Sequence, residues 1–309
     1  MSAHVPVLLE EAVSALRVRP GGRYIDGTFG RGGHSSAIAA RGGSVLGIDR
    51  DMQAIEEWES ARAGLDPEVA ARISLVHGNH GDIADIARGR GWDGVDGVLL
   101  DLGVSSPQLD EAERGFSFMR DGPLDMRMDR TRGATAADIV NGATEEELAN
   151  IFRRFGEEPR AWRIARAIAS ERGPRPFSST LQLAATVERS AGRHSPRHPA
   201  TRVFQALRMA VNDETGERER ALEGALGLLR PGGVFAVIVF ESITSRIVKR
   251  FFAAHEGREA SLPQGGSRWC GELPRVRRVG ARATAPGKEE ATSNRRARSA
   301  KLRAVEVVE

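Results

Sequence analysis

The segment from Asp101 to Asp129 carries the densest set of residues that could do chemistry. It begins D-L-G-V-S-S-P-Q-L-D and, from residue 114, continues R-G-F-S-F-M-R-D-G-P-L-D-M-R-M-D. The apolar run V-D-G-V-L-L before it predicts a buried strand that ends at Asp101. Ligands of open α/β sheets bind beyond the carboxyl ends of the strands. A carboxylate at that place, followed by Ser105 and Ser106, could therefore accept hydrogen bonds from the N–H groups of a ligand.

Residues 110–129 have neither the period of a strand nor that of a helix. Apolar side chains alternate irregularly with arginines and acids, and these apolar positions are Phe116, Phe118, Met119, Met126 and Met128. A polar, aperiodic segment with apolar anchors is typical of an ordered functional loop. An ordinary connector is the alternative.

A glycine-rich turn lies in Y-I-D-G-T-F-G-R-G-G-H-S at residues 24–35. A strand is predicted to end at Asp26, and the glycines after it permit positive φ and a close approach of the backbone to a ligand. Dinucleotide-binding turns follow G-x-G-x-x-G, but Ser35 takes the place of the third glycine here. Methyltransferase turns place glycines two, four and six residues after an acid, and Thr28 replaces the first of these. The turn alone therefore favours neither cofactor.

Asp49 ends the next predicted strand, about 20 residues after the glycine turn. A carboxylate at this place can accept hydrogen bonds from both ribose hydroxyls of a nucleoside cofactor. The alternative is that Asp49 caps the helix that follows Asp51.

The elements that must position these residues are strands and helices that alternate along the chain. Short β-branched runs predict strands at 23–26, 44–48, 73–77 and 95–100, with helices that begin near Gly33, Met52 and Asp82. After residue 203 the pattern resumes with a long amphipathic helix, a Pro-Gly-Gly break and the strand V-F-A-V-I-V-F. The closing K-L-R-A-V-E-V-V predicts a final edge strand. This is the pattern of a doubly wound, Rossmann-like α/β sheet.

Residues 110–205 have almost no strand pattern but good helix patterns. Thr144 and Glu147 predict a capping box for a helix that stops at Gly156. Further helices are expected over residues 161–171 and after Ser179. We therefore predict an inserted helical domain, residues 110–205, within a discontinuous α/β domain made of residues 1–109 and 206–309. Only the Gly- and Arg-rich stretch at 257–294 looks loose.

Composition limits the function classes. At 309 residues and 40% hydrophobic content the chain can bury a sizeable core. No apolar run approaches the roughly 20 residues that span a bilayer, and the basic region of a secretory signal is missing, so a cytoplasmic protein is expected. Cys270 is the only cysteine, which excludes an internal disulfide and a cysteine-rich zinc site.

Charge is distributed unevenly. The net charge is +3, but residues 268–303 carry +8 and the rest carries −5. Nearly all of the positive charge is arginine, which favours bidentate contacts to phosphate. This asymmetry indicates an anionic partner such as nucleic acid, although a GC-rich genome would also enrich arginine.

The Asp101–Asp129 segment closely resembles that of the MraW (RsmH) family of S-adenosylmethionine-dependent methyltransferases, which modify the N4 of a cytosine in bacterial 16S rRNA. The resemblance also covers H-V-P-V-L-L-E-E at 4–11, the glycine turn, H-P-A-T-R-V-F-Q-A-L-R at 198–208, I-V-K-R-F at 247–251 and R-A-R-S-A-K-L-R at 296–303. Strings of this length are far more specific than one glycine motif. The resemblance implies a class I methyltransferase sheet, the cofactor S-adenosylmethionine and the small ribosomal subunit as partner.

The resemblance also implies which residues bind the cofactor. Gly32, Gly33 and His34 are expected to contact the methionine moiety and Asp49 the ribose. Asp101 and Gln108 complete the pocket. His80 falls where relatives usually carry a phenylalanine beside the adenine, and histidine can still stack there.

Methyl transfer to a cytosine amine needs in-line approach and an unshielded lone pair, but no metal. Because the lone pair of the amine is delocalised into the ring, the protein must accept hydrogen bonds from its N–H groups and dispose of a proton. The candidates for this role are Asp101, Ser105, Ser106 and Glu241. At Glu241, which ends a central strand in F-E-S-I-T-S-R, close relatives usually carry a histidine.

Phe116, Phe118 and Trp162 are candidates for stacking on the base, although such aromatics are more often core residues. RNA phosphates would be bound by the basic C-terminal segment and by Arg120, Arg127, Arg160, Arg163, Arg166 and Arg202. Two other functions stay open: a nicotinamide oxidoreductase, favoured only by the glycine turn and Asp49, and a non-catalytic RNA-binding assembly factor with a methyltransferase fold.

Overall fold

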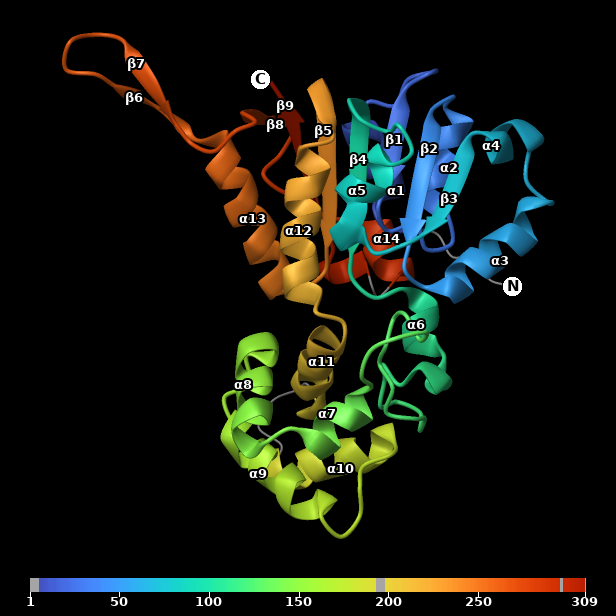
Figure 1. Ribbon diagram of the computed structural model, residues 1–309, viewed down its shortest axis with the longest axis vertical. Coiled ribbons are helices and arrows are strands. Elements are labelled where there is room, and N and C mark those ends of the chain that lie inside the picture. Colours follow the sequence, from blue (N-terminus) through green and yellow to red (C-terminus); the bar gives the residue numbers. More distant parts are fainter. Residues whose placement is uncertain (1–5, 193–197, 295–296, 309) are drawn as a thin grey trace. The chain divides into compact units, whose positions relative to one another are not determined.

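The computed structural model describes residues 6–192, 198–294 and 297–308. The chain forms two compact units, which we call the sheet unit (Met1–Gly103 with Gly216–Glu309) and the helical unit (Val104–Thr215) (Figure 1). His4, Val5, Arg295 and Arg296, which entered the motifs or the charge count above, lie outside the described residues. No helix in the described ranges is both long and apolar enough to cross a membrane.

The sheet unit is built on a seven-stranded sheet. Across the sheet the strands are β3 (Ile73–His77), β2 (Ser44–Asp49), β1 (Arg23–Asp26), β4 (Val95–Leu102), β5 (Leu229–Val239), β9 (Lys301–Val307) and β8 (Val276–Arg278). The first five are parallel to one another, whereas β9 is antiparallel to both of its neighbours. The predicted parallel strands are confirmed.

Two predictions for the C-terminal part were wrong. The closing strand β9 is not at the edge, because β8 pairs with its outer side through Val276↔Val307. The stretch 257–294 is also not loose: it forms β8, the hairpin of β6 (Arg258–Ser261) and β7 (Ser267–Cys270), and α14 (Lys288–Ser293). These elements are only three to six residues long, so they have too little apolar periodicity to be recognised.

Helices cover both faces of the sheet. One face packs against α5 (Ile83–Arg88), α12 (Glu214–Leu226) and α13 (Ser242–Glu256), and the other against α1 (Leu9–Ala15), α2 (Gly33–Ala40) and α3 (Met52–Arg62) (Figure 1). The short α4 (Pro67–Ala71) precedes β3. Successive residues of β5 belong to the two cores in turn: Phe235, Val237 and Val239 to the first, Val234, Ala236 and Ile238 to the second. A strand buried on both faces must be apolar throughout, which explains the unbroken run V-F-A-V-I-V.

The helical unit has its own core. It contains α6 (Ser106–Asp110), α7 (Ala136–Gly142), α8 (Glu145–Gly156), α9 (Ala161–Arg172), α10 (Thr180–Ala191) and α11 (Ala200–Val211). The predicted capping box is confirmed: Thr144 Oγ1 accepts a hydrogen bond from the Glu147 N–H, and the Glu147 carboxylate accepts one from the Thr144 N–H. Ser179 caps α10, as its place in the sequence predicts.

The long helix predicted after residue 203 is instead two helices, α11 and α12, broken at Asn212 and Asp213. Asp213 has φ 43°, which ends the helical path. The buried Asn212 side chain accepts a hydrogen bond from Met128 N–H and donates one to the Met126 carbonyl, both at 2.8 Å. The break therefore serves a long-range contact that no local pattern shows.

The segment 110–129 is held in place by buried residues, as its apolar anchors suggest. Met126 and Met128 are buried, and the buried Arg114 donates to the Met128 carbonyl at 3.1 Å. Met119 was wrongly taken for an anchor, because 81% of it is exposed.

Candidate active site

Four acidic residues lie at the carboxyl edge of the sheet. Asp26 ends β1, Asp49 ends β2, Asp101 is the penultimate residue of β4, and Glu241 follows β5 (Figure 1). The chain builds β2 and β3 on one side of β1 and then returns to build β4 and β5 on the other. The crevice at such a reversal of strand order is where open α/β sheets bind ligands.

Asp101 has an unusual environment for a carboxyl group. Burial, with a contribution from the charge of Asp26, raises the pKa of Asp101 from 3.8 to about 7. Its backbone N–H donates to Thr28 Oγ1 at 2.6 Å. Its Oδ1 is buried and has no hydrogen-bond partner within the described ranges. Because a buried acceptor without a donor costs about 1–3 kcal/mol, a ligand that brings an N–H or O–H to this atom is favoured.

Asp26 fixes the beginning of the glycine turn. Its carboxylate is buried and accepts hydrogen bonds from Ser35 Oγ at 2.7 Å and from the Thr28 N–H at 3.2 Å. Burial outweighs these bonds and raises the pKa of Asp26 to about 6. The sequence marks Asp26 only as a strand end, because its burial and its two donors depend on the folded turn.

Asp49 is held by two backbone groups. Its Oδ2 accepts a hydrogen bond from the Gly30 N–H at 2.6 Å, and its Oδ1 accepts one from the Asp51 N–H at 2.8 Å. Burial raises the pKa of Asp49 to about 6, and the charge of Asp51 adds to the shift. The helix-cap alternative fails, because Asp51 caps α3 by accepting from the Gln53 N–H. The carboxylate of Asp49 is thus fixed in orientation and keeps lone pairs for a ligand.

The glycines of the turn differ in what they do. A Cβ on Gly32 would lie 2.6 Å from Trp58, and one on Gly33 would lie 2.2 Å from Pro6, so these two glycines are required by packing within the protein. Gly30 has φ 56° and nothing within 4 Å of a Cβ. It therefore leaves open space beside Asp49, in agreement with the positive φ and close backbone approach predicted for the glycines of this turn.

The two histidines of the candidate site have different environments. The buried His34 ring contacts the Val7 carbonyl through Nε2 at 3.2 Å, which orients it at the start of α2. His80 begins a single turn of 3₁₀ helix after β3, and its Cβ is 3.8 Å from where a Cβ on Gly27 would lie. His80 is thus close to the first glycine of the turn, and its contact with the adenine stays a prediction.

Comparison with known proteins identifies the family. A model of the MraW methylase family matches residues 1–308. The chain belongs to the MraW methylase family. It is 50% identical to the ribosomal RNA small subunit methyltransferase H of Thermomicrobium roseum, covering 99% of this chain and 94% of that protein. It is 46% identical to the protein of that name from Shewanella violacea, covering 99% and 98%, and 48% identical to that from Shewanella oneidensis, covering 98% and 97%.

Membership of the MraW methylase family agrees with the architecture of the sheet unit, which is that of class I methyltransferases. It also decides against the nicotinamide oxidoreductase that the glycine turn left open.

In this MraW methylase Glu241 is the residue that precedes α13. Its backbone carbonyl accepts a hydrogen bond from the Ser245 N–H at 2.9 Å, but its side chain does not cap the helix. The half-buried carboxylate follows β5, the strand that pairs with β4 beside Asp101. Both acids therefore lie at one edge of the sheet unit.

The other predicted site residues belong to the helical unit. Ser105 caps α6 and forms a capping box with Gln108, whose Oε1 accepts from the Ser105 N–H at 3.0 Å. Gln108 is buried. Ser106 is the first residue of α6, and its side chain is outside the described part of the structure. Ser105 and Gln108 thus have a local structural role, and any further role of the three residues stays a prediction.

The candidate RNA-binding aromatics and arginines of this MraW methylase fall into two groups: some are buried or bound within the helical unit, and others are exposed. Phe116 is buried, and Phe118 packs against His198 and Phe204, whereas 45% of Trp162 is exposed on α9. Three of the arginines are bound within the unit, through Arg127 to Asp125, Arg160 to the Ala191 carbonyl and Arg202 to the Glu157 carbonyl. The exposed positions next to Trp162 on α9 are Arg163 and Arg166.

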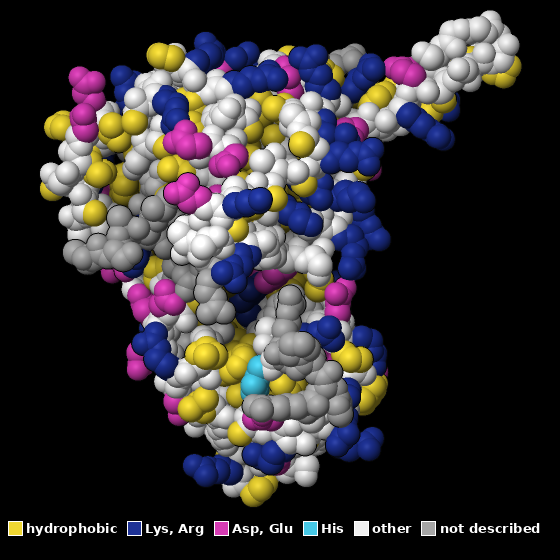
Figure 2. Space-filling model, turned by 180° about the vertical axis from the view of Figure 1, so that it is seen from behind, with side chains coloured by type: hydrophobic (Ala, Val, Ile, Leu, Met, Phe, Trp, Pro, Cys, Tyr) yellow, Lys and Arg dark blue, Asp and Glu magenta, His cyan; other side chains and the backbone are white. Residues whose placement is uncertain are grey.

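Part of the basic C-terminal segment is neutralised inside the sheet unit. Arg275, Arg277 and Arg278 pair with Glu259, Glu306 and Glu256. Arg246, Lys249 and Arg250 form an exposed cationic face on α13 that the charge count of residues 268–303 did not include. Figure 2 shows lysine and arginine side chains gathered at the base of the projecting β6–β7 hairpin.

Proposed function

We propose that this protein uses S-adenosylmethionine to methylate the exocyclic N4 amine of a cytosine in the 16S rRNA of the small ribosomal subunit, in the cytoplasm. Near-complete coverage of relatives named ribosomal RNA small subunit methyltransferase H supports the reaction class. The observation that carries the chemistry is the buried Asp101 Oδ1 at the ligand-binding edge of the sheet, for which the described residues supply no hydrogen-bond donor.

The residues of the carboxyl edge fit S-adenosylmethionine. When bound, this cofactor supplies a methyl group carried by a positively charged sulfonium sulfur. Asp49 can accept the ribose hydroxyls on its remaining lone pairs, with Gly30 leaving room beside it. We assign Gly32, Gly33 and His34 to the methionine moiety and His80 to the adenine. The acids Asp26 and Asp101 complement its positive charge.

Asp101 and Glu241 are the groups that can act on the cytosine amine. A carboxylate that accepts a hydrogen bond from an amine N–H draws electron density toward nitrogen and favours its pyramidal form. A pKa of about 7 lets Asp101 take up the proton that the amine loses and release it to water near neutral pH. Glu241, at the end of the neighbouring strand, can accept the second N–H.

Substrate recognition requires cations and an exposed aromatic. We propose that the helical domain, residues 110–205, recognises RNA with Trp162, Arg120, Arg163 and Arg166, and that the exposed cations of α13 bind phosphate. Arginine suits phosphate contacts because its planar group presents two parallel donors.

The deciding experiment incubates the purified protein with labelled S-adenosylmethionine and small subunits from cells that lack this methylation. Nucleoside mass spectrometry then locates the label. We expect label on cytosine N4 with the wild type and at least a hundredfold slower labelling with D101N, whereas E219Q, a substitution on the exposed part of α12, labels at the wild-type rate. Binding of the cofactor and the subunit without any label would instead support the non-catalytic assembly factor.

Glu241 is tested separately in the same assay. We expect E241A to lower the rate of labelling at least tenfold while the affinity for S-adenosylmethionine stays within twofold. An unchanged rate in E241A would remove Glu241 from the chemistry and leave Asp101 as the acceptor.

A further inference from the structure

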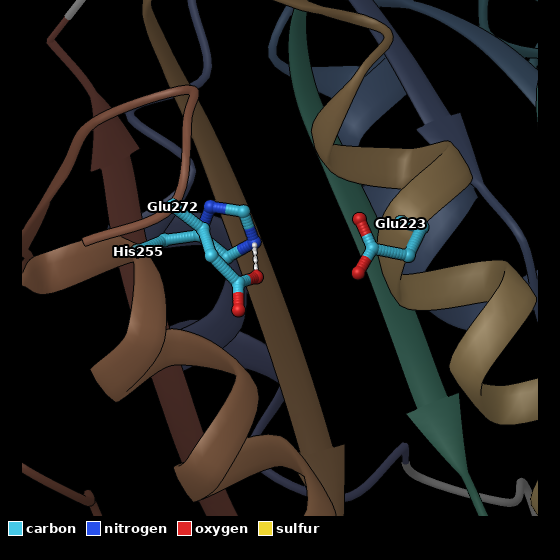
Figure 3. Close-up of side chains that lie close together, drawn as sticks. All are labelled: Glu223, His255 and Glu272. Atoms are coloured by element: carbon cyan, nitrogen blue, oxygen red, sulfur yellow. Dashed lines mark ion pairs between the residues drawn. The ribbon is translucent and has the colours of Figure 1, made fainter.

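One cluster of ligating side chains lies apart from the carboxyl edge. Glu223 of α12, His255 of α13 and Glu272 of the turn after β7 each offer one ligand atom, and these atoms all lie within 4.8 Å of one another (Figure 3). His255 is buried, whereas both glutamates are exposed. All three residues belong to the sheet unit.

The imidazole of His255 is fixed by its surroundings. Nδ1 lies 3.2 Å from the Pro274 carbonyl oxygen, which can only accept a hydrogen bond, so Nδ1 carries the hydrogen. The ring packs against the Phe251 ring with centroids 4.7 Å apart. The turn that carries Glu272 is anchored to the same helix end, because the Glu272 N–H donates to the Ala254 carbonyl at 3.0 Å.

This arrangement directs the other ring nitrogen at the two carboxylates. Nε2 is buried, has no hydrogen-bond partner among the described residues, and lies 3.5 Å from Glu272 Oε2 (Figure 3). With the hydrogen on Nδ1, a neutral ring presents the lone pair of Nε2 to two anions. The lone pairs of Nε2 and of the two carboxylate oxygens repel one another. A cation placed between these three atoms would be bound by all of them.

We propose that Glu223, His255 and Glu272 bind a divalent transition-metal ion of the zinc type. An imidazole and two carboxylates are ligands that zinc accepts, with water in the fourth position. Ligand atoms about 2.0 Å from a tetrahedral ion are about 3.3 Å apart, so the cluster must contract slightly, which the two exposed glutamates allow. The bond from Nδ1–H to a backbone carbonyl is the outer contact that zinc-binding histidines usually make.

The ion would have a structural role, distinct from methyl transfer. His255 is fourteen residues after Glu241 along α13, which corresponds to about 21 Å of helix at 1.5 Å per residue. A bound ion would join α12, the end of α13 and the turn before β8, and thereby fasten the most arginine-rich part of the sheet unit. Because an ion that binds only the folded state stabilises it, zinc should raise the melting temperature.

The test uses the full chain without an affinity tag, treated with a chelator and then desalted. Zn²⁺ is titrated by calorimetry, Co²⁺ is followed by its visible absorption, and melting temperatures are measured with and without Zn²⁺. We expect one ion per chain in the wild type and a rise in melting temperature. His255→Asn keeps a donor for the Pro274 carbonyl but loses the ligand, so this ion and this rise should disappear. E219Q is the matched control on α12 and should bind as the wild type does.

Two further variants keep the proposal testable if His255→Asn does not fold. E223Q and E272Q change exposed side chains, and each should weaken Zn²⁺ binding at least tenfold. The proposal is overturned if the wild type binds no Zn²⁺, or if E223Q and E272Q bind it as tightly as E219Q does. In either case the cluster is an ordinary side-chain pair of His255 and Glu272.

Discussion

At the scale of single residues, the raised pKa of Asp101 links the site to the stability of the protein. A carboxyl group whose pKa rises from 3.8 to about 7 on folding favours the folded state below about pH 4, and this contribution is lost as the pH rises through 7. D101N removes the buried negative charge. We expect D101N to be more stable than the wild type by about 1–3 kcal/mol at pH 8, with the difference vanishing near pH 4.

Asp96 provides a contrasting control for this prediction. Hydrogen bonds from the Arg23 N–H and from the side chains of Arg19 and Arg230 overcome partial burial and lower the pKa of Asp96 to about 2. D96N should therefore be less stable than the wild type at pH 7, with a difference that shrinks as the pH falls toward 2. Denaturant titrations across this range measure both. Equal effects of the two substitutions would contradict the origin assigned to the Asp101 shift.

Cofactor binding should be linked to protons for the same reason. The pKa values of Asp26, Asp49 and Asp101 are raised to about 6, 6 and 7, and a bound cation favours their charged forms. We expect the affinity for S-adenosylmethionine to rise roughly tenfold between pH 5.5 and 8, with protons released on binding. The affinity for S-adenosylhomocysteine, whose sulfur is neutral, should depend less on pH. Calorimetry in buffers of different ionisation enthalpy counts the protons, and no release would refute the link.

Residue types and spacing were enough to predict that Asp49 and Asp101 lie at the carboxyl edge of the sheet, because each follows an apolar run that the sequence shows clearly. The burial of Asp26 and the hydrogen bond from the Gly30 N–H to Asp49 were not predicted. They depend on packing and on the direction of backbone N–H groups in the folded turn, neither of which has a local pattern.

At the scale of elements, Asn212 lies at the break between α11 and α12, and its side chain is hydrogen-bonded to the long loop of the same helical unit. Asn212→Ala would remove the hydrogen bonds that the buried Asn212 side chain forms with the Met128 N–H and the Met126 carbonyl. We expect a loss of about 2–4 kcal/mol in the free energy of unfolding, since each unsatisfied buried group costs about 1–3 kcal/mol. The exposed Asn150 on α8 is the matched control, and Asn150→Ala should change stability by less than about 0.5 kcal/mol. Equal losses would show that these two bonds contribute little.

The sequence predicted elements wherever a long apolar period or a cap was present. The five parallel strands and the capped α8 are examples. It failed where tertiary contacts decide: at β8, whose three residues pair only because β9 lies beside them, and at Asn212, where the side chain reaches a loop more than eighty residues away.

At the scale of the whole molecule, the charge asymmetry of the sequence indicated an anionic partner. It identified only some of the cations that are available to bind that partner. Three arginines of the basic segment are used in ion pairs, whereas the exposed cations of α13 lie outside that segment. A run of residues counted along the chain therefore overstates the charge available to a partner, and the folded surface is the better guide.

The last prediction follows from this surface. If Arg246, Lys249 and Arg250 bind phosphate, neutralising all three with glutamine should lower the slope of log affinity against log salt for small-subunit RNA by about 2–3, because each phosphate contact contributes about 0.7–0.9. A second variant with glutamine at Arg72, Arg88 and Arg90 loses the same charge on other exposed parts of the sheet unit, near β3 and α5. It should leave the slope within about 0.5 of the wild-type value. Filter binding over a range of salt measures all three proteins. Similar slopes for the two variants would mean that net charge, and not the face of α13, determines how this methyltransferase holds its RNA.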